Sequence, residues 1–315
     1  MVRASMFSAV PGTGSWAAAF APGHVTGIFE PVLTSRDPLA RGSIGAGVVL
    51  DIGARARAEV WAVRPGHGRV ELCERGRPTH LPITERALSW LPGAPDHLLR
   101  VDLTHELPVS QGLSMSAAGA VAATLAASAA MGAPPEAAFS AAHRAELEMH
   151  GGLGGVPAIL GGGLEVRRAP GLPPHGRIER TPLEMGFFLG TTGAPMPSPP
   201  LLSDPGFLQR VSAAARRWID SLGSPPLSWE STIQVFEHFT DDLGLAPPAL
   251  RSVIEELRRG GCHAAQAMLG NTLLVWAADE DGEAQLLATL RRAHLTPWRV
   301  HVGDRGAGLV PLHPR

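Results

Sequence analysis

Small and hydroxyl-bearing residues gather in the segment 108–118, which reads PVSQGLSMSAA. Gly112 lets the backbone turn closely, and Ser114 and Ser116 supply hydroxyl groups just before a long alanine-rich stretch that predicts a helix. The free amide groups at the start of a helix and the positive end of its dipole attract anions. The pattern therefore fits a phosphate site without a lysine, and an ordinary helix with a serine cap is the alternative.

The composition narrows the chemistry further. The chain of 315 residues contains no lysine and no tyrosine, and Asn271 is its only asparagine. A Walker-type phosphate loop and Schiff-base chemistry both need a lysine, so neither is expected. The 27 basic and 29 acidic side chains nearly balance, and the arginines form only scattered pairs, so we expect no nucleic-acid partner.

The two cysteines and the hydropathy pattern bear on the location of the protein. Cys73 and Cys262 are far apart and match neither a metal site nor a disulfide framework, which fits a reducing, cytoplasmic setting. The most apolar stretch, 117–131, is dominated by alanine and falls short of the ~20 strongly apolar residues that span a membrane. We therefore expect a cytoplasmic protein with no membrane partner.

The elements that must position the segment 108–118 alternate irregularly along the chain. Hydrophobic patterning predicts strands at 17–29 (with a turn at Pro22-Gly23), 48–50, 58–63, 98–103, 164–168, 185–189 and 272–277. It predicts helices after residue 114, at 135–149, 207–222, 228–243, 247–259 and 282–294. The glycine-rich segments 42–47 and 151–155 are expected to be loops, and 169–177, rich in Pro and Gly, is expected to separate two halves. Without a regular βαβ repeat, an α+β fold is preferred.

Five segments together resemble a known family. The segment 108–119 (PVSQGLSMSAAG) resembles the phosphate-binding motif of the GHMP kinases. Four further segments resemble the pantoate kinase branch of archaea, namely AFAPGHVTGIFEP at 19–31, DPLARGSIGAG at 37–47, AHRAE at 142–146 and QAMLGNTLLVWA at 266–277. These blocks extend over most of the chain.

The resemblance implies a fold, a reaction and a division into domains. The fold would be the α+β GHMP kinase fold, with a ribosomal protein S5-like N-terminal domain and a ferredoxin-like C-terminal domain. The reaction would be the transfer of phosphate from ATP, with Mg²⁺, to the hydroxyl of pantoate or another small hydroxy acid, in coenzyme A biosynthesis. The domains would be an extension at 1–16, an ATP-binding domain at 17–168 and a C-terminal domain at 178–315. Oligomeric state is left open, with a homodimer as one alternative.

The resemblance also assigns the nucleotide and metal residues. Ser116 and Glu146 would hold Mg²⁺, which prefers hard oxygen ligands. Without the family, a solvated helix carboxylate is the favoured explanation of Glu146, and Glu148 is the nearby alternative. The residues that would bind the nucleotide are Pro108, Ser110, Gly112, Leu113, Ser114, Ser116, Ala117 and Ala118.

The acceptor and catalytic residues come from three other segments. Arg41 could pair with a substrate carboxylate, and a solvent-facing side chain is the alternative. His24 could polarise a phosphate or contact the substrate, or it could be a buried histidine in a turn. The remaining residues of the expected acceptor site are Gly42, Ser43, Gly45, Gly47, Gly152 and Gly154.

Four positions depart from the pantoate branch. The branch usually has an aspartate, a candidate base, at the position of Gly155, and a threonine at that of Gly151. It usually has a lysine near Pro200 and an arginine at Ile44. His150 is a candidate replacement base. Because general-base catalysis contributes about 10²–10⁴-fold, a slow kinase, a kinase with another acceptor, and a non-catalytic nucleotide- or acid-binding protein are all open.

Overall fold

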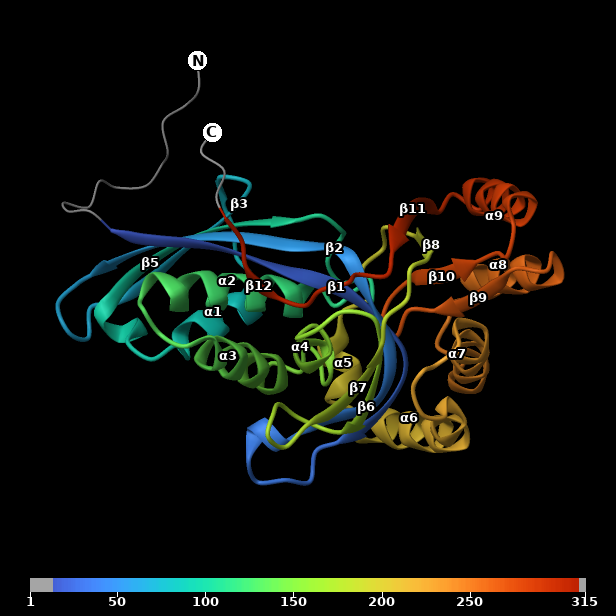
Figure 1. Cartoon of the computed structure of the whole chain (residues 1–315), viewed down its shortest axis with the longest axis horizontal. Helices are drawn as coiled ribbons and strands as arrows, with labels where there is room; N and C mark the ends of the chain where they lie inside the picture. Colours follow the sequence, from blue (N-terminus) through green and yellow to red (C-terminus); the bar gives the residue numbers. More distant parts are fainter. Residues whose placement is uncertain (1–13, 312–315) are drawn as a thin grey trace, which may run out of the picture.

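Two long antiparallel strands, β1 and β2, pair with each other in the larger of two sheets (Figure 1). The computed structural model describes residues 14–311 of the chain. The larger sheet has the strand order β12-β1-β2-β5-β3-β4, and β6 joins it through β2 and is paired with β7. Its strands are β1 (Ser15–Val32), β2 (Gly42–Ala62), β3 (Arg69–Glu74), β4 (Arg77–Pro78), β5 (His97–His105), β6 (Leu164–Ala169), β7 (Arg177–Thr181) and β12 (Gly308–Leu309).

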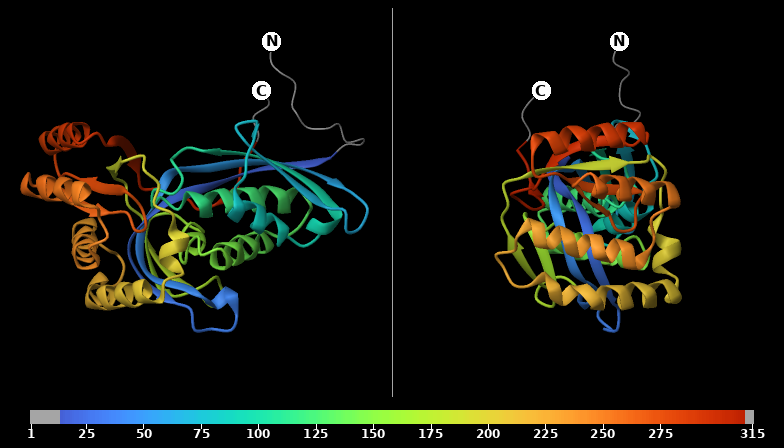
Figure 2. Two further views of the ribbon diagram at one scale, coloured as in Figure 1. Left: turned by 180° about the vertical axis from the view of Figure 1, so that it is seen from behind. Right: turned by 90° about the vertical axis from the view of Figure 1, so that its right-hand side faces the viewer.

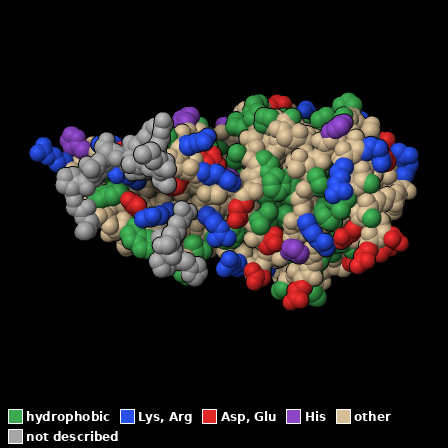
Figure 3. Space-filling view, turned by 90° about the horizontal axis from the view of Figure 1, so that it is seen from above, with side chains coloured by type: hydrophobic (Ala, Val, Ile, Leu, Met, Phe, Trp, Pro, Cys, Tyr) green, Lys and Arg blue, Asp and Glu red, His purple; other side chains and the backbone are tan. Residues whose placement is uncertain are grey.

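One face of this sheet is covered by helices and the other is not (Figures 1 and 2). The covering helices are α1 (Pro82–Ser89), α2 (Met115–Ala130) and α3 (Pro135–Glu148). The residues of β2 alternate accordingly, because Ala54, Ala56 and Ala58 are buried beneath the helices while Arg55 and Arg57 are exposed. On the face seen in Figure 3, acidic and basic side chains lie close together. Arg57 forms an ion pair with Glu59 on the same strand.

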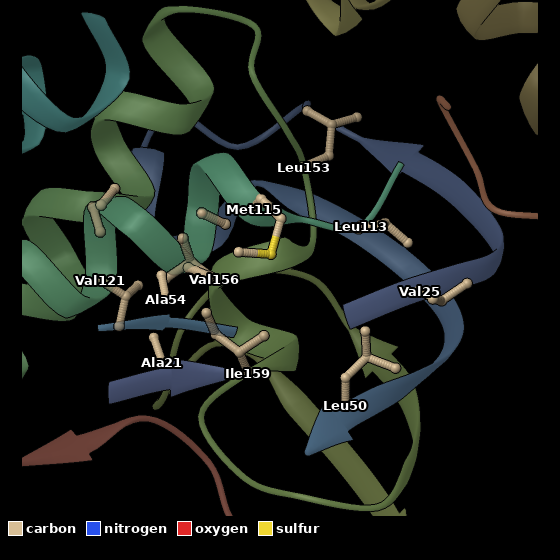
Figure 4. Close-up of a cluster of buried hydrophobic side chains, with 14 of the residues drawn as sticks. Ala21, Val25, Leu50, Ala54, Leu113, Met115, Val121, Leu153, Val156 and Ile159 are labelled. Carbon is tan, nitrogen blue, oxygen red and sulfur yellow. The ribbon is translucent and has the colours of Figure 1, made fainter. Parts of the chain in front are cut away.

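Helix α2 packs between the larger sheet and other helices, and its small residues allow this close packing. It is buried on almost every side, between the sheet and the helices α1 and α3. Its alanines and Gly119 carry little side-chain volume, so neighbouring backbones can approach closely. Figure 4 shows the apolar side chains beneath its start, where Leu113 and Met115 lie among residues of β1, β2 and α4 (Gly155–Ala158).

The second sheet has the order β11-β8-β10-β9 and lies beyond one end of the larger sheet (Figure 2). Helices α7, α8 and α9 pack on it, and α6 and α7 pack against β1. The strands are β8 (Gly186–Thr191), β9 (His263–Gln266), β10 (Thr272–Trp276) and β11 (Thr296–His301). The helices are α5 (Ser198–Leu202), α6 (Pro205–Trp218), α7 (Trp229–Leu243), α8 (Pro248–Arg259) and α9 (Glu280–Arg292). Within residues 14–311, none of the helices combines the length and the apolar character that crossing a membrane requires.

The α+β class and the expected helices are confirmed, and two local predictions are wrong. The segment 42–47 is not a loop but the start of β2, and Pro22-Gly23 does not turn the chain but lies within β1, beside an irregularity in its pairing with β2. A Cβ on Gly45 would collide with the carbonyl oxygen of Ile28 on β1, so glycine there serves close strand pairing.

The structure also shows where the chain passes from one sheet to the other. The segment 169–177 connects β6 to β7, which are neighbours in the larger sheet, and the chain enters the second sheet only between β7 and β8. It returns to the larger sheet with β12. The expected division into domains stays a prediction, and its first part, residues 1–16, lies mostly outside the described residues.

Candidate active site

A cavity of about 340 Å³ opens where the two sheets approach each other. The predicted phosphate segment forms its centre, through Ser110, Gly112, Leu113, Ser114 and Ser116. The end of α3, the glycine stretch 151–155, the start of α5 and the turn at 268–269 complete the wall. Pro108, Ala117 and Ala118 do not line the cavity, and Ala117 and Ala118 instead form the buried first turn of α2.

The phosphate segment presents free amide groups to the cavity. Ser114 is the N-cap residue of α2 and has left-handed backbone angles, and its side chain makes no capping hydrogen bond. The alternative of an ordinary serine-capped helix is therefore wrong. The first amide groups of a 16-residue helix are left for an anion. Gly112 has a φ of 80°, and a Cβ there would lie 2.7 Å from the carbonyl oxygen of Ala267, so the segment needs glycine.

Ser116 and Glu146 meet on one side of this helix start. The Ser116 hydroxyl donates to Oε1 of Glu146 at 2.8 Å, and Glu146 is 3% exposed. Burial raises the pKa of Glu146 to about 7. A Cβ on Gly152 would collide with Oε2 of Glu146, so the glycine stretch makes room for this carboxylate. Glu148 is exposed and bonded to Arg86, away from this pair.

These two side chains fit a magnesium ion by the chemistry of their donors. Both offer hard oxygen atoms beside the amide groups that would hold phosphate, and Mg²⁺ usually takes its remaining ligands from phosphate and water. Among residues 14–311, no cluster of three or more His, Cys, Asp or Glu side chains could hold a metal ion. Any metal here would therefore depend on few protein ligands.

The lining of the cavity also includes Thr26, Phe29, Ser43 and Gly154. Behind Gly154 lies Arg167, which is 2% exposed, and a Cβ on Gly154 would come within 2.9 Å of its Nε. The Nε and Nη2 atoms of Arg167 have no hydrogen-bond partner among residues 14–311. The sequence analysis missed Arg167, although an arginine inside the buried pattern LEVRRA was a signal that could have found it.

Arg167 belongs to a charged cluster with Glu165, His24 and Arg180, of which Arg180 is only half-buried and the others are buried. Its Nη1 donates to Oε1 of Glu165, and the same oxygen lies 3.0 Å from Nε2 of His24. Arg180 caps the end of α4 by donating to backbone carbonyl groups, among them that of Ala158 at 2.8 Å. Burial lowers the pKa of His24, against the opposing effect of Glu165, so this side chain is neutral. The cluster therefore holds two positive charges and one negative charge.

The predicted acceptor residues separate into two groups. Ser43, Gly152 and Gly154 line the cavity. Arg41 does not, because its Nε donates to the carbonyl oxygen of Ser35 and its own carbonyl oxygen accepts from His143. The remaining residues, Gly42, Gly45 and Gly47, lie in β2 and leave space for neighbouring backbone or, at Gly47, for the ring of His24.

The two predicted catalytic histidines occupy different surroundings. His150 is exposed at the end of α3 with a φ of 52°, and it does not line the cavity. His24 is fully buried directly behind the wall, where its Nδ1 lies 3.4 Å from the Thr26 hydroxyl and 3.5 Å from the Ser114 hydroxyl. His24 can therefore act on a ligand only through those hydroxyl groups.

Of the four positions that depart from the pantoate branch, Gly151 and Gly155 line the cavity, whereas Ile44, in β2, and Pro200 do not. Gly155 begins α4, and a Cβ there would lie 3.5 Å from the Ser114 hydroxyl oxygen. Pro200 lies in α5, next to Pro199 in the wall. Met268 and Leu269, which come from the AMLGNT block, also line the cavity and were not predicted as site residues.

Comparison with known proteins agrees with this geometry. The family profile described as "GHMP kinases N terminal domain" matches residues 84–163, which include the phosphate segment, Glu146 and the glycine stretch. A pantoate kinase of Thermococcus kodakarensis is 30% identical over 283 residues, covering 86% of this chain and 92% of that protein. A pantoate kinase of Methanospirillum hungatei is 28% identical, covering 80% of this chain and 84% of that protein.

A solved structure extends the likeness to the fold as a whole. A protein described as a phosphotransferase related to the coenzyme A biosynthesis pathway superposes with a TM-score of 0.79 and 26% identity. The match covers 94% of this chain and 98% of that one. The chain therefore belongs to the GHMP kinase family, as an ATP-dependent phosphotransferase that acts on a hydroxyl group.

Proposed function

We propose that the chain transfers phosphate from ATP to the hydroxyl group of pantoate, giving 4-phosphopantoate. The observation that carries this proposal is the pair of unpartnered nitrogen atoms on buried Arg167, next to the cavity wall at Gly154. A buried guanidinium whose nitrogen atoms lack hydrogen-bond partners is strongly stabilised by a carboxylate that accepts from them. The acceptor is therefore a small acid, and the names of the matched relatives supply pantoate as its identity.

The charge of the buried cluster supports an acid acceptor. With His24 neutral, Arg167 and Arg180 carry two positive charges against the single charge of Glu165. An excess buried charge is costly unless a partner compensates it. A bound carboxylate would bring the cluster and the substrate together to neutrality.

The nucleotide would bind with its phosphates at the start of α2. Ser116 and Glu146 would hold Mg²⁺, which supplies charge neutralisation for the transferred phosphoryl group. Pro82, Ile83 and Met149 provide an apolar part of the wall near Glu146, which suits the base of the nucleotide. Phosphoryl transfer depends mainly on such positioning and electrostatics.

One observation favours a second candidate, a kinase for a less anionic acceptor. No basic side chain of the described residues lines the cavity directly, and Phe29, Leu202, Met268 and Leu269 give its wall an apolar character. A branched alcohol would fit such a surface. A homodimer and a cytosolic location also stay predictions, the latter from the unpaired cysteines Cys73 and Cys262.

The test is ADP release by the purified protein with ATP, Mg²⁺ and a panel of acceptors containing pantoate, other hydroxy acids and uncharged alcohols. We expect turnover with pantoate and identification of 4-phosphopantoate by mass spectrometry. Arg167→Met should raise the KM for pantoate at least tenfold while leaving the KM for ATP nearly unchanged. Arg168→Met is the matched control, because its side chain bonds to Glu179 on β7 away from the cavity. Preference for an uncharged alcohol would contradict the pantoate assignment.

A further inference from the structure

Three polar side chains connect the cavity wall to the buried cluster in a continuous line. The Ser114 hydroxyl lines the cavity and lies 3.5 Å from Nδ1 of His24. The opposite ring nitrogen, Nε2, lies 3.0 Å from Oε1 of Glu165. His24 and Glu165 are each 0% exposed, so bulk water does not reach either of them.

The neighbours of His24 fix the position of its proton. Nε2 faces a carboxylate, which can only accept, so a neutral ring carries its hydrogen on Nε2. Nδ1 is then an acceptor for the hydroxyl groups of Ser114 and Thr26. The three groups thus stand in the order of a catalytic triad, in which a hydroxyl donates to an imidazole and the imidazole donates to a carboxylate. Such hydrogen bonds are often long without substrate and shorten when it binds.

The cavity offers little else that could take a proton from an acceptor. Glu146 is the single ionisable side chain that lines it within residues 14–311, and its Oε1 is engaged by Ser116. At Gly155, where a side chain would reach within 3.5 Å of the Ser114 hydroxyl, there is none. Ser114 stands directly at the start of α2, next to the amide groups that would hold the transferred phosphate.

We propose that Ser114, His24 and Glu165 form a proton relay that serves as the general base of this kinase. This inference rests on the proposed transfer of phosphate to a hydroxyl. As the acceptor oxygen bonds to the γ-phosphorus and the bond from phosphorus to the ADP oxygen breaks, the acceptor proton passes to Oγ of Ser114. The original Ser114 proton passes at the same time to Nδ1 of His24. Glu165 stabilises the resulting imidazolium, which afterwards returns its proton through Ser114 to the phosphorylated product or to ADP.

The charged groups around His24 set how this relay responds to pH. Burial has the largest effect and lowers the pKa of His24, Glu165 raises it, and Arg167 and Arg180 lower it further. The ring is therefore neutral and ready to accept a proton at neutral pH. We expect the acidic limb of kcat to lie below pH 6.5, the ordinary value for histidine.

The decisive experiment combines His24→Gln with Gly155→Asp. Glutamine can still donate to Glu165 but cannot accept a proton, so His24→Gln should lower kcat about 100-fold with little change in KM, and should abolish the acidic limb. Gly155→Asp puts a carboxylate beside the Ser114 hydroxyl and requires Cβ of Ala117, 3.0 Å from the new Cβ, to move by a few tenths of an ångström. The double variant should recover at least tenfold in kcat.

A loss of rate in His24→Gln that is equal at every pH and that Gly155→Asp does not restore would overturn the relay. Ser114→Ala is a second test in case the His24 variant does not fold, because it leaves the buried cluster intact. Its loss of kcat should also be restored by Gly155→Asp. His80→Gln is the matched control, since His80 is 77% exposed in its pairing with Glu85 and should keep the wild-type pH profile.

A measurement without turnover separates the relay from the proposed function. If no acceptor is phosphorylated, the proposed function fails, but nitrogen-15 NMR of the histidine rings still decides the relay. Comparison with His24→Gln identifies the resonances of His24. A neutral ring protonated on Nε2, with an Nδ1 resonance that shifts in Ser114→Ala, supports the relay, and a ring protonated on Nδ1 overturns it.

Discussion

At the scale of single residues, the site depends on ionisable groups that the fold removes from water. Glu146 shows the effect most clearly, because it is buried with one hydroxyl partner and its pKa is raised to about 7. The folded protein therefore binds a proton that the unfolded chain, with a pKa near 4.5, releases. The free energy of unfolding must then fall as the pH rises from about 4.5 to about 7.

We predict that the metal-free protein loses up to about 3 kcal/mol of unfolding free energy between pH 4.5 and 7 through Glu146 alone. Glu146→Gln should remove that part of the pH dependence. Urea unfolding in the presence of a chelator, at several pH values, measures it. Glu148→Gln, at an exposed position on the same helix, should follow the wild type, and identical pH profiles for all three proteins would contradict the prediction.

The sequence predicted some of these residues and missed others for physical reasons. Ser116 and Glu146 stand in segments with recognisable patterns, and the structure brings them within hydrogen-bond distance, although their role with metal stays a prediction. Arg167 stands in the short buried strand β6, where an arginine among apolar residues is a weak signal that does not by itself identify a ligand site. Arg41 was the more conspicuous arginine, yet its Nε donates to a nearby carbonyl group outside the cavity.

At the scale of elements, the phosphate segment depends on a turn from the second sheet. A Cβ on Gly270 would collide with the backbone of Gln111, and one on Gly112 would approach the carbonyl oxygen of Ala267. The turn at 267–270 and the phosphate segment thus pack backbone against backbone. Leu269 has a φ of 57° at the tip of the turn, a strained angle for a branched side chain.

We predict that Gly270→Ala pushes this turn away from the phosphate segment, raises the KM for ATP at least tenfold and destabilises the protein. The nearest atoms are backbone, so the collision cannot be relieved by a side-chain movement. Steady-state kinetics and thermal unfolding measure the two effects. Gly206→Ala is the control, because a Cβ there, in the first turn of α6, meets only the side chains of Asp204 and Arg210, and it should change neither quantity by much. An ATP KM for Gly270→Ala equal to that of the wild type would refute the prediction.

Helices were easier to predict than the glycine-rich strands. Pro135, Pro205 and Pro248 each stand at the first helical position, so a local signal fixes the start of α3, α6 and α8. Glycine carries no such signal, because a loop and a closely paired strand both use it. The segment 42–47 is such a closely paired strand. Its conformation depends on the pairing with β1 and cannot be inferred from its own residues.

At the scale of the whole molecule, the cavity is closed by parts of both sheets. The groups that we propose bind phosphate and metal come from α2 and α3, whereas Met268 and Leu269 come from the hairpin of the second sheet. The long strands β1 and β2 also connect the part around the larger sheet with the part around the second sheet. Strand β1 contacts α2 as well as α6 and α7, and β2 contacts β11. Ligands bound in the cavity should therefore stabilise the two regions together.

We predict a single unfolding transition in scanning calorimetry, shifted upward by ATP with Mg²⁺ and further by pantoate. At a ligand concentration of 100 times Kd, each ligand adds about 2.7 kcal/mol. The shift due to pantoate should be lost in Arg167→Met, while the shift due to ATP is kept. Two separate transitions, of which only one responds to ATP, would show that the sheets unfold independently.

The path of the chain between the sheets has a consequence for biosynthesis. Strand β12 pairs with β1 at the edge of the larger sheet, and Val302 forms a bridge with Leu50, yet both segments follow every strand from β8 to β10 in the sequence. A growing polypeptide can therefore complete the edge of its first sheet only after the second sheet has left the ribosome. Until then the outer edge of β1 at Ala19 and Phe20 has no partner strand, and an unpaired strand edge can pair with strands of other molecules.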